Sequence, residues 1–514
     1  MNKNLSNKFY NFTLILLSIF FAFIFYNDQV AVRGGLIISN EIVFQDKISP
    51  LQYYFLNSWT LLTQFSAILL KLGLSVKLVS LLLVFFLTLI LFSSCFLILV
   101  HFTENKTLSL ILTIFLILFQ KNLGDTDYPS LIFTVHTFGA YAQALTGLII
   151  ASLLYKNLNI SIFLSLILIT IHPIVGLWLI FIILISIYYC RESCNLKKSL
   201  KGIIFGTIIV LLSLIFYFYL SIDKISYDQG LFNVYMEKWD GHRAITSKLH
   251  YEYIIKTLLF FLILNIFCPK NEKYKLFKIF LNFLITSSLL LYILFQFLNL
   301  NEIGFLSPII PGRFMVTYTF IAWPLILSLI YFKLRDRKYT KNIFYLLIII
   351  YSLMHYKDLI NVKNKFNEKY FITNNNVLSV WNEQNNVFKK LSKIENTGNI
   401  IATEYSASNI LYLSKRPLLL MRSFDFLPYH PYLINSIKKI LTEVYGYDFN
   451  NPPKMHYPYL DDDFIKEIFE KRTLNEWLEI KNKFNSNFLI VPKNWNLNLN
   501  LFYSDRNFSL YKIN

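Results

Sequence analysis

LVSLLLVFFLTLILFSSCFLILV, residues 78–100, is an apolar segment of 23 residues without a single charged side chain. A segment of that length crosses the hydrocarbon core of a bilayer as one helix. Comparable segments recur along the chain, which has 514 residues and is 55% hydrophobic but only 16% charged. This composition excludes a soluble enzyme, a disordered chain and a coiled coil, and the long unbroken apolar runs exclude an outer-membrane barrel. The sequence therefore predicts an α-helical polytopic membrane protein.

Eleven segments are predicted to span the membrane. The first follows Lys3 and Lys8, as in a signal peptide, but no small-residue cleavage site follows it, which favours a retained helix. Residues 59–71 are apolar but short, which favours a re-entrant or interfacial helix. The predicted spans form a transmembrane domain of residues 1–356 and cover residues 10–26, 77–101, 107–120, 131–155, 158–171, 174–189, 203–220, 252–268, 279–298, 314–332 and 342–356.

The distribution of basic residues orients these spans. With the N-terminus in the cytoplasm, the cytoplasmic segments hold 17 Lys and Arg in 48 residues, whereas the opposite loops hold 9 in 108. The net charge of +18 then indicates loops that face anionic lipid, not nucleic acid. The count depends on His172-Pro173, interpreted as a tight turn between two short spans because Pro173 breaks a helix. A mere kink there would reverse the orientation of everything downstream. We expect a bacterial inner or plasma membrane protein.

The last part of the chain has a different composition, polar and rich in lysine. An odd number of spans places it outside the cytoplasm, with a helical connector over residues 357–395 and a small α/β domain over residues 396–514. Thr473 and Glu476 form a predicted capping box at the start of one of its helices. The predicted strands cover residues 399–405, 416–421, 488–492 and 508–513, and the predicted helices cover residues 431–445, 462–471 and 473–485.

The first extracytoplasmic loop carries three carboxylates, Asp28, Glu41 and Asp46. A carboxylate at the membrane surface acts as a general base when its surroundings raise its pKa. A solvated loop with acidic residues is the alternative. The next such loop contains Asp125 and Asp127 in a DxD spacing, whose oxygens suit a hard cation such as Mg²⁺ or Mn²⁺ beside a leaving phosphate. A turn rich in Gly, Asp and Pro accounts for the same residues without a metal.

A third loop groups Trp239, Asp240, His242 and Arg243. An aromatic ring, a carboxylate, an imidazole and a guanidinium within five residues are suited to a polar ligand, because Arg binds phosphate through two parallel hydrogen bonds. An interfacial tryptophan with charged neighbours that extend toward water is the alternative.

Single polar residues near the ends of spans complete the candidates. Arg313 begins a predicted helix, where the helix dipole disfavours a cation, so it either binds a lipid phosphate or pairs with Glu302. His172 lies at the predicted turn, and His136 and Gln143 lie in another span; ionisable residues are rare within spans. A structural role for such a histidine is the alternative.

This arrangement resembles the GT-C superfamily of integral-membrane glycosyltransferases. The resemblance consists of a cytoplasmic N-terminus, an acidic first outer loop with an amphipathic segment, about eleven spans and a C-terminal outer domain. It implies transfer of a sugar from a polyprenyl-phosphate-linked donor to an extracytoplasmic acceptor, with a first-loop carboxylate as base. It also implies that Asp125 and Asp127 occupy the loop that holds a metal motif in oligosaccharyltransferase-like members. The carboxylate pair typical of the mannosyltransferase branch and the WWD motif are absent from the sequence.

Shorter motifs resemble a group of uncharacterised bacterial multi-spanning proteins: ITIHPIVGLW at residues 169–178, EW at 476–477 and the closing FLIVPK and NFSLYKI. Three hypotheses remain open at this point. The chain is a lipid-carrier-dependent glycosyltransferase; or a polymerase, ligase or flippase for polysaccharide lipids; or a membrane anchor for an outer domain without enzymatic activity.

Overall fold

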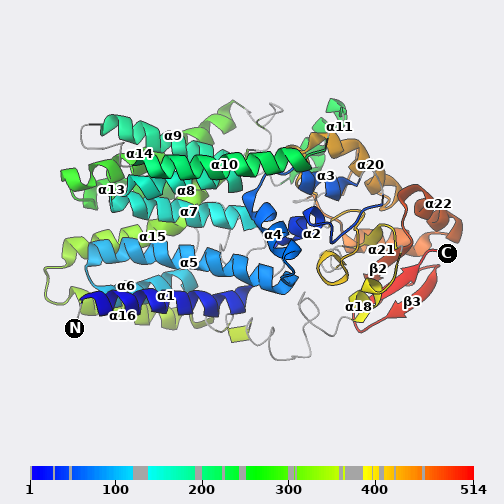
Figure 1. Cartoon of the computed structure of the whole chain (residues 1–514), viewed down its shortest axis with the longest axis horizontal. Helices are drawn as coiled ribbons and strands as arrows, with labels where there is room; N and C mark the ends of the chain where they lie inside the picture. Colours follow the sequence, from blue (N-terminus) through cyan, green and yellow to red (C-terminus); the bar gives the residue numbers. More distant parts are fainter. Residues whose placement is uncertain are drawn as a thin grey trace. The chain divides into compact units, whose positions relative to one another are not determined.

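The protein is mostly helical and ends in a small four-stranded sheet, as seen in a computed structural model (Figure 1). The chain divides into two compact units. The helical unit comprises Met1–Tyr26, Ser80–Leu214 and Leu249–Phe371, and the mixed unit comprises Asn27–Val79, Ile215–Lys248 and Ile372–Asn514. The structure describes residues 3–26, 29–45, 49–119, 137–191, 199–222, 226–241, 251–298, 306, 309–357, 360, 363–364, 386–395, 397–403, 410–421, 424–453 and 458–514.

The long helices of the helical unit run side by side along one direction (Figure 1). Among the described residues, five helices are long and apolar enough to cross a membrane: α1 (Lys3–Phe25), α5 (Val76–Thr103), α10 (Leu200–Leu220), α14 (Lys275–Phe297) and α15 (Gly312–Leu334). The other six segments predicted to span also form helices: α6 (Lys106–Phe119), α7 (Thr137–Leu154), α8 (Leu158–Ile171), α9 (Pro173–Tyr189), α13 (Tyr251–Phe267) and α16 (Thr340–Met354).

Length separates the two groups. The 14 residues of α8 extend over about 21 Å at 1.5 Å per residue, which is less than the hydrocarbon thickness of about 30 Å. Helices α8 and α9 nevertheless pack tightly as a pair, because Gly176 lets the backbones approach. A Cβ at Gly176 would lie 2.4 Å from the backbone nitrogen of Ile169. The chain thus turns sharply between these two helices, as the sequence predicts for His172-Pro173.

The sheet belongs to the mixed unit, in the order β1-β2-β4-β3. Strand β1 (Ile400–Ala402) pairs in parallel with β2 (Phe488–Pro492), and β4 (Phe508–Lys512) pairs antiparallel with both β2 and β3 (Asn500–Ser504). The predicted strand at 416–421 is only an isolated bridge between Ile400 and Leu418, and β3 was not predicted. Strand β2 covers the five residues expected from the sequence.

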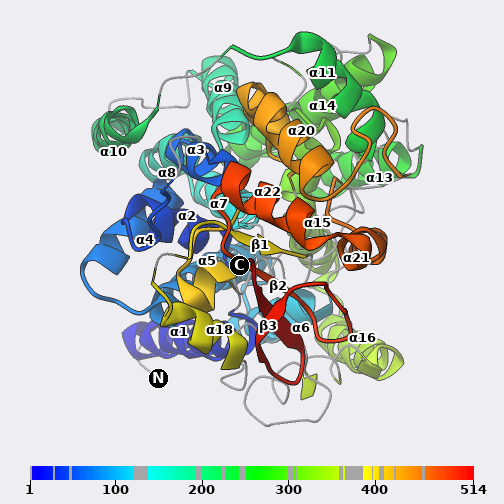
Figure 2. The ribbon, with the colours of Figure 1, turned by 90° about the vertical axis from the view of Figure 1, so that its right-hand side faces the viewer.

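Helices cover both faces of this sheet (Figure 2). The core on one face is shared with α20 (Ile434–Glu443), α21 (Asp462–Lys471) and α22 (Leu474–Phe484), and α22 begins with the predicted capping box of Thr473 and Glu476. Helix α18 (Asn386–Ser392) lies against β3 and β4, with Phe388 in ring contact with Phe508. The short helical turns of this unit are η2 (Tyr235–Trp239), η5 (Ile410–Ser414), η6 (Leu427–Tyr429) and η7 (Pro431–Leu433).

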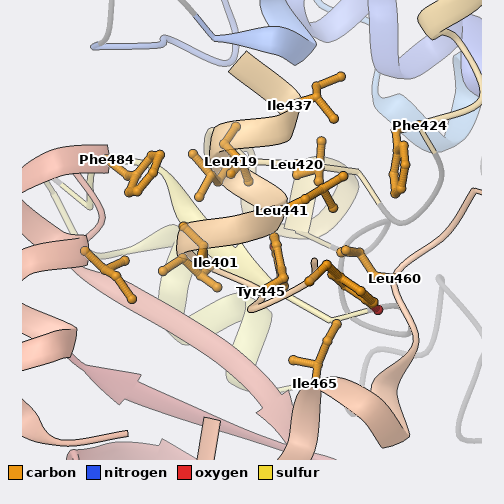
Figure 3. Close-up of a cluster of buried hydrophobic side chains, with 14 of the residues drawn as sticks. Ile401, Leu419, Leu420, Phe424, Ile437, Leu441, Tyr445, Leu460, Ile465 and Phe484 are labelled. Atoms are coloured by element: carbon orange, nitrogen blue, oxygen red, sulfur yellow. The ribbon is translucent and has the colours of Figure 1, made fainter. Parts of the chain in front are cut away.

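The hydrophobic core of the mixed unit joins segments that are distant in sequence (Figure 3). Ile401, Leu441 and Tyr445 of the C-terminal region lie in the same buried cluster as Tyr53 of the first loop and Trp239 of the loop after α10. The predicted 396–514 domain therefore lies within a larger folded unit that also contains two loops from the first half of the chain.

The first of these loops folds into three helices, α2 (Val30–Ile38), α3 (Pro50–Leu56) and α4 (Leu61–Lys71). Helices α2 and α4 pack closely, because Gly35 leaves no room for a Cβ, which would lie 2.8 Å from Cβ of Ser66. The opposite face of α4 exposes Phe65 and Ile68. An exposed apolar face on a short helix is typical of a helix at a membrane surface. The short helix predicted for residues 59–71 is thus present, and its place at the membrane stays a prediction.

Candidate functional site

A small polar pocket in the helical unit contains three of the residues singled out from the sequence, Gln143, His172 and Arg313. It is formed by the N-terminal ends of α7 and α15 and by the turn between α8 and α9. Its space amounts to about 10 Å³, close to what one water molecule needs. The residues that line it are Gly139, Ala142, Gln143, His172, Val175, Arg313, Val316 and Thr317.

Local sequence fixes the position of His172. It caps the end of α8 and the start of α9, with φ −142° and ψ 85°, because Pro173 at the first position of α9 does not tolerate a preceding helical residue. Its backbone N–H donates to the carbonyl of Leu168, and its carbonyl accepts from the N–H of Gly176. Both backbone groups are therefore used, and the imidazole is left to face the pocket.

Helix α7 brings Gln143 to the same place. Gly147, one turn further along α7, lets α15 approach closely, since a Cβ there would lie 2.4 Å from Cζ of Phe320. Gln143 is only 4% exposed, and its Oε1 accepts no hydrogen bond from any residue that the structure describes. The sequence signal for this residue is an amide in an otherwise apolar helix.

The charges in the pocket favour a neutral histidine. Burial, together with the positive charge of Arg313, lowers the pKa of His172 from 6.5 to about 4. Its Nδ1 is buried and has no hydrogen-bond partner within the described part of the chain. Thr317 donates its hydroxyl proton to the carbonyl of Arg313 at 2.7 Å, which helps to hold the first turn of α15. Glu302, the other partner considered for Arg313, lies outside the described residues.

Of the three first-loop carboxylates, Glu41 lies within the described residues. Asp28 and Asp46 lie outside the described residues, whereas Glu41 forms an ion pair with Lys415 within the mixed unit. This pair gives Glu41 a structural role, because it links the first loop to Lys415, the residue directly after η5. A hydrogen bond also links the first loop to η5: the hydroxyl of Tyr412 donates to the carbonyl of Gln29 at 2.5 Å.

Trp239 and Asp240 are fully buried in the mixed unit. The indole N–H of Trp239 donates to the carbonyl of Phe449 at 2.8 Å, and its ring contacts Phe424 and Tyr447. No face of the indole is open for a sugar to stack upon, so packing explains this tryptophan. His242 and Arg243, the other members of the predicted group, lie outside the described residues.

The proposed metal ligands Asp125 and Asp127 also lie outside the described residues, as does His136. Elsewhere in the described ranges, no three metal-ligating side chains come together.

Sequence reasoning missed one polar network in the mixed unit. Nε2 of His430 lies 3.1 Å from the hydroxyl of Ser58, and Nδ1 lies 2.7 Å from the hydroxyl of Tyr432. Because Ser58 donates its proton to the carbonyl of Tyr54 at 2.6 Å, Nε2 of His430 is the donor to Ser58. The serine is thus not activated as a nucleophile, and the network ties α3 to the C-terminal region.

The chain was also compared with known proteins. No protein-family model matches it, and no curated protein has significant sequence similarity to it.

Proposed function

We propose that this protein is a membrane glycosyltransferase of the GT-C type, which transfers a sugar from a polyprenyl-phosphate donor to an extracytoplasmic acceptor. In this proposal eleven helices span the membrane, the N-terminus is cytoplasmic and the mixed unit is extracytoplasmic. The observation that carries the proposal is the pocket of Gln143, His172 and Arg313, where a cation and a neutral imidazole meet at the ends of apolar helices.

The composition of the mixed unit supports the proposed topology. It contains the two large loops that the positive-inside rule places outside, together with the C-terminal region that an odd number of spans places on the same side. Every basic segment that the rule places in the cytoplasm belongs to the helical unit. Segments that fold around one core must lie on one side of a membrane.

The proposed reaction divides two tasks between charged residues. Arg313 holds the phosphate of the donor, since a guanidinium pairs well with phosphate oxygens. A first-loop carboxylate takes the proton from the acceptor hydroxyl, whose oxygen attacks the anomeric carbon with inversion while the lipid phosphate departs with the bonding electrons. Because Glu41 already pairs with Lys415, we assign the role of base to Asp28 or Asp46.

The test uses the full chain reconstituted in nanodiscs with a panel of short-chain polyprenyl-phosphate hexoses as donors. We expect Asp28→Asn or Asp46→Asn to lower kcat by about 10²- to 10⁴-fold with little change in KM. Glu41→Gln is the matched control in the same loop and is expected to retain activity. EDTA, followed by Mg²⁺ or Mn²⁺, tests separately whether Asp125 and Asp127 bind a metal. Full activity in both aspartate variants contradicts the proposed base, and absence of transfer with every donor favours the anchor hypothesis.

A further inference from the structure

The pocket of the helical unit contains a buried hydrogen-bond acceptor that a phosphate group cannot satisfy. Oε1 of Gln143 is a buried acceptor without a donor among the described residues. Buried polar atoms in folded proteins nearly always have a partner, so an exception needs an explanation such as a bound water or ligand. A phosphate oxygen does not provide one, because it is itself an acceptor.

His172 adds a second buried polar atom without a hydrogen bond at the same place. Nδ1 is buried and makes no hydrogen bond to the described chain. A neutral imidazole has one nitrogen that donates and one that accepts. Burial and the adjacent cation Arg313 disfavour the doubly protonated ring, which would have no acceptor at all.

The size of the pocket limits what enters it. With room for about one water molecule, it accommodates a single hydroxyl group but not a whole sugar ring. A hydroxyl group can donate to Gln143 or His172 and accept from a nearby N–H donor. Arg313, which is partly exposed, lines the same pocket and brings a positive charge that attracts an anion.

We infer that this pocket selects anionic headgroups that carry a hydroxyl group close to the phosphate, with Gln143 and His172 as the residues that recognise the hydroxyl. The inference rests on the proposed function for the lipid nature of the ligand. It assigns Gln143 a role in specificity: a site built to hydrogen-bond a hydroxyl rejects a ligand without one, because its own polar groups would be left unpaired.

The experiment compares two lipids of equal charge. Phosphatidylglycerol has two hydroxyl groups beyond its phosphodiester, and phosphatidylmethanol has none. Native mass spectrometry of the full chain in detergent, titrated with each lipid, gives the ratio of the two affinities. We expect the wild type to prefer phosphatidylglycerol by roughly 3- to 10-fold, which corresponds to one neutral hydrogen bond.

Three variants separate recognition of the hydroxyl group from binding of the phosphate. Gln143→Leu, of similar size, is expected to remove the preference while leaving the affinity for phosphatidylmethanol unchanged. Arg313→Gln is expected to weaken the binding of both lipids. Thr146→Val is the matched control, since Thr146 is buried on α7, donates to the carbonyl of Ala142 and does not line the pocket; it should keep the preference. Thermal unfolding confirms that each variant is folded.

Equal affinities in the wild type, or a preference that persists in folded Gln143→Leu, would overturn the inference and leave the pocket as a site for a structural water. Neither result depends on turnover. The hydroxyl preference can therefore fail while sugar transfer is observed, and it can hold while transfer is absent.

Discussion

The candidate polar residues of the two units differ in their hydrogen bonding. In the mixed unit, three of the polar residues described above have partners: Glu41 pairs with Lys415, Trp239 donates to Phe449 and Ser58 contacts His430. In the pocket of the helical unit, Oε1 of Gln143 and Nδ1 of His172 have none within the described chain. A hydrogen-bonded polar group is explained by the architecture, whereas a buried group without a partner needs a further explanation, such as a bound water or a ligand. Buried polar atoms without a hydrogen-bond partner among the described residues also occur in the mixed unit, as at Thr60 and Trp477. Gln143 and His172 differ in that they line one pocket, which directs the search for a binding site there.

Replacing Trp239 tests whether a hydrogen-bonded polar residue of the mixed unit has a structural role. Trp239→Ala leaves a cavity in the mixed core and deprives the carbonyl of Phe449 of its donor, so we expect a loss of about 3–5 kcal/mol in the stability of that unit. Hydrogen exchange followed by mass spectrometry on the full chain measures the loss in peptides of α20 and β2. The control is Tyr227→Ala, a 38% exposed aromatic in the same loop, which should change stability by under about 1 kcal/mol.

A small loss of stability in Trp239→Ala would mean that the loop after α10 contributes little to the core of the mixed unit. Trp239 would then be available again as a residue for ligand binding. Sugar binding that is lost while the α20 and β2 peptides remain protected would reverse the assignment made here.

Replacing Gly176 tests whether the pocket of the helical unit depends on the close packing that positions His172. In Gly176→Ala the new methyl group meets the backbone of Ile169, which cannot move aside as a side chain can. We expect the α8–α9 pair to separate slightly, at a cost of about 1–3 kcal/mol, and His172 to shift from the pocket. Thermal unfolding in detergent and the lipid preference of the chain report the two effects. Leu177→Ala, at a 57% exposed neighbour on α9, is the control. An unchanged lipid preference in a destabilised Gly176→Ala variant would show that His172 does not take part in recognising the headgroup hydroxyl.

Local signals in the sequence predicted local structure well. The capping box of Thr473 and Glu476, strand β2 and the turn at His172-Pro173 each depend on residues within a few positions of one another. Strand β3 was missed because its exposed Asn and Leu residues belong to an edge strand without the usual buried face. The expected strand at 416–421 contributes only one bridge, and Pro417 has no N–H to donate there.

The candidate site was harder to predict because its meaning depends on contacts distant in sequence. The burial of Trp239 results from Phe424, Tyr447 and Phe449, some 200 residues further along the chain. His172 and Arg313 could be noted as unusual, but only the packing of α7 against α15 brings Gln143 beside them. Which polar residues are satisfied is a property of the fold and has no signature in the sequence.

The smallest expected effect concerns Glu41 and tests whether a partnered carboxylate is structural. Lys415 is 47% exposed and Glu41 is 26% exposed, so water screens their ion pair and its contribution to stability is under about 1 kcal/mol. Glu41→Gln and Lys415→Gln should therefore shift the unfolding of the mixed unit equally and slightly, and the double variant should cost no more than either single change, because the interaction is already lost. Hydrogen exchange in α2 and η5 provides the measurement. A loss of sugar transfer in Glu41→Gln but not in Lys415→Gln would show that the carboxylate acts on a ligand. The rule that a polar residue with a partner in the protein has a structural role would then fail for Glu41.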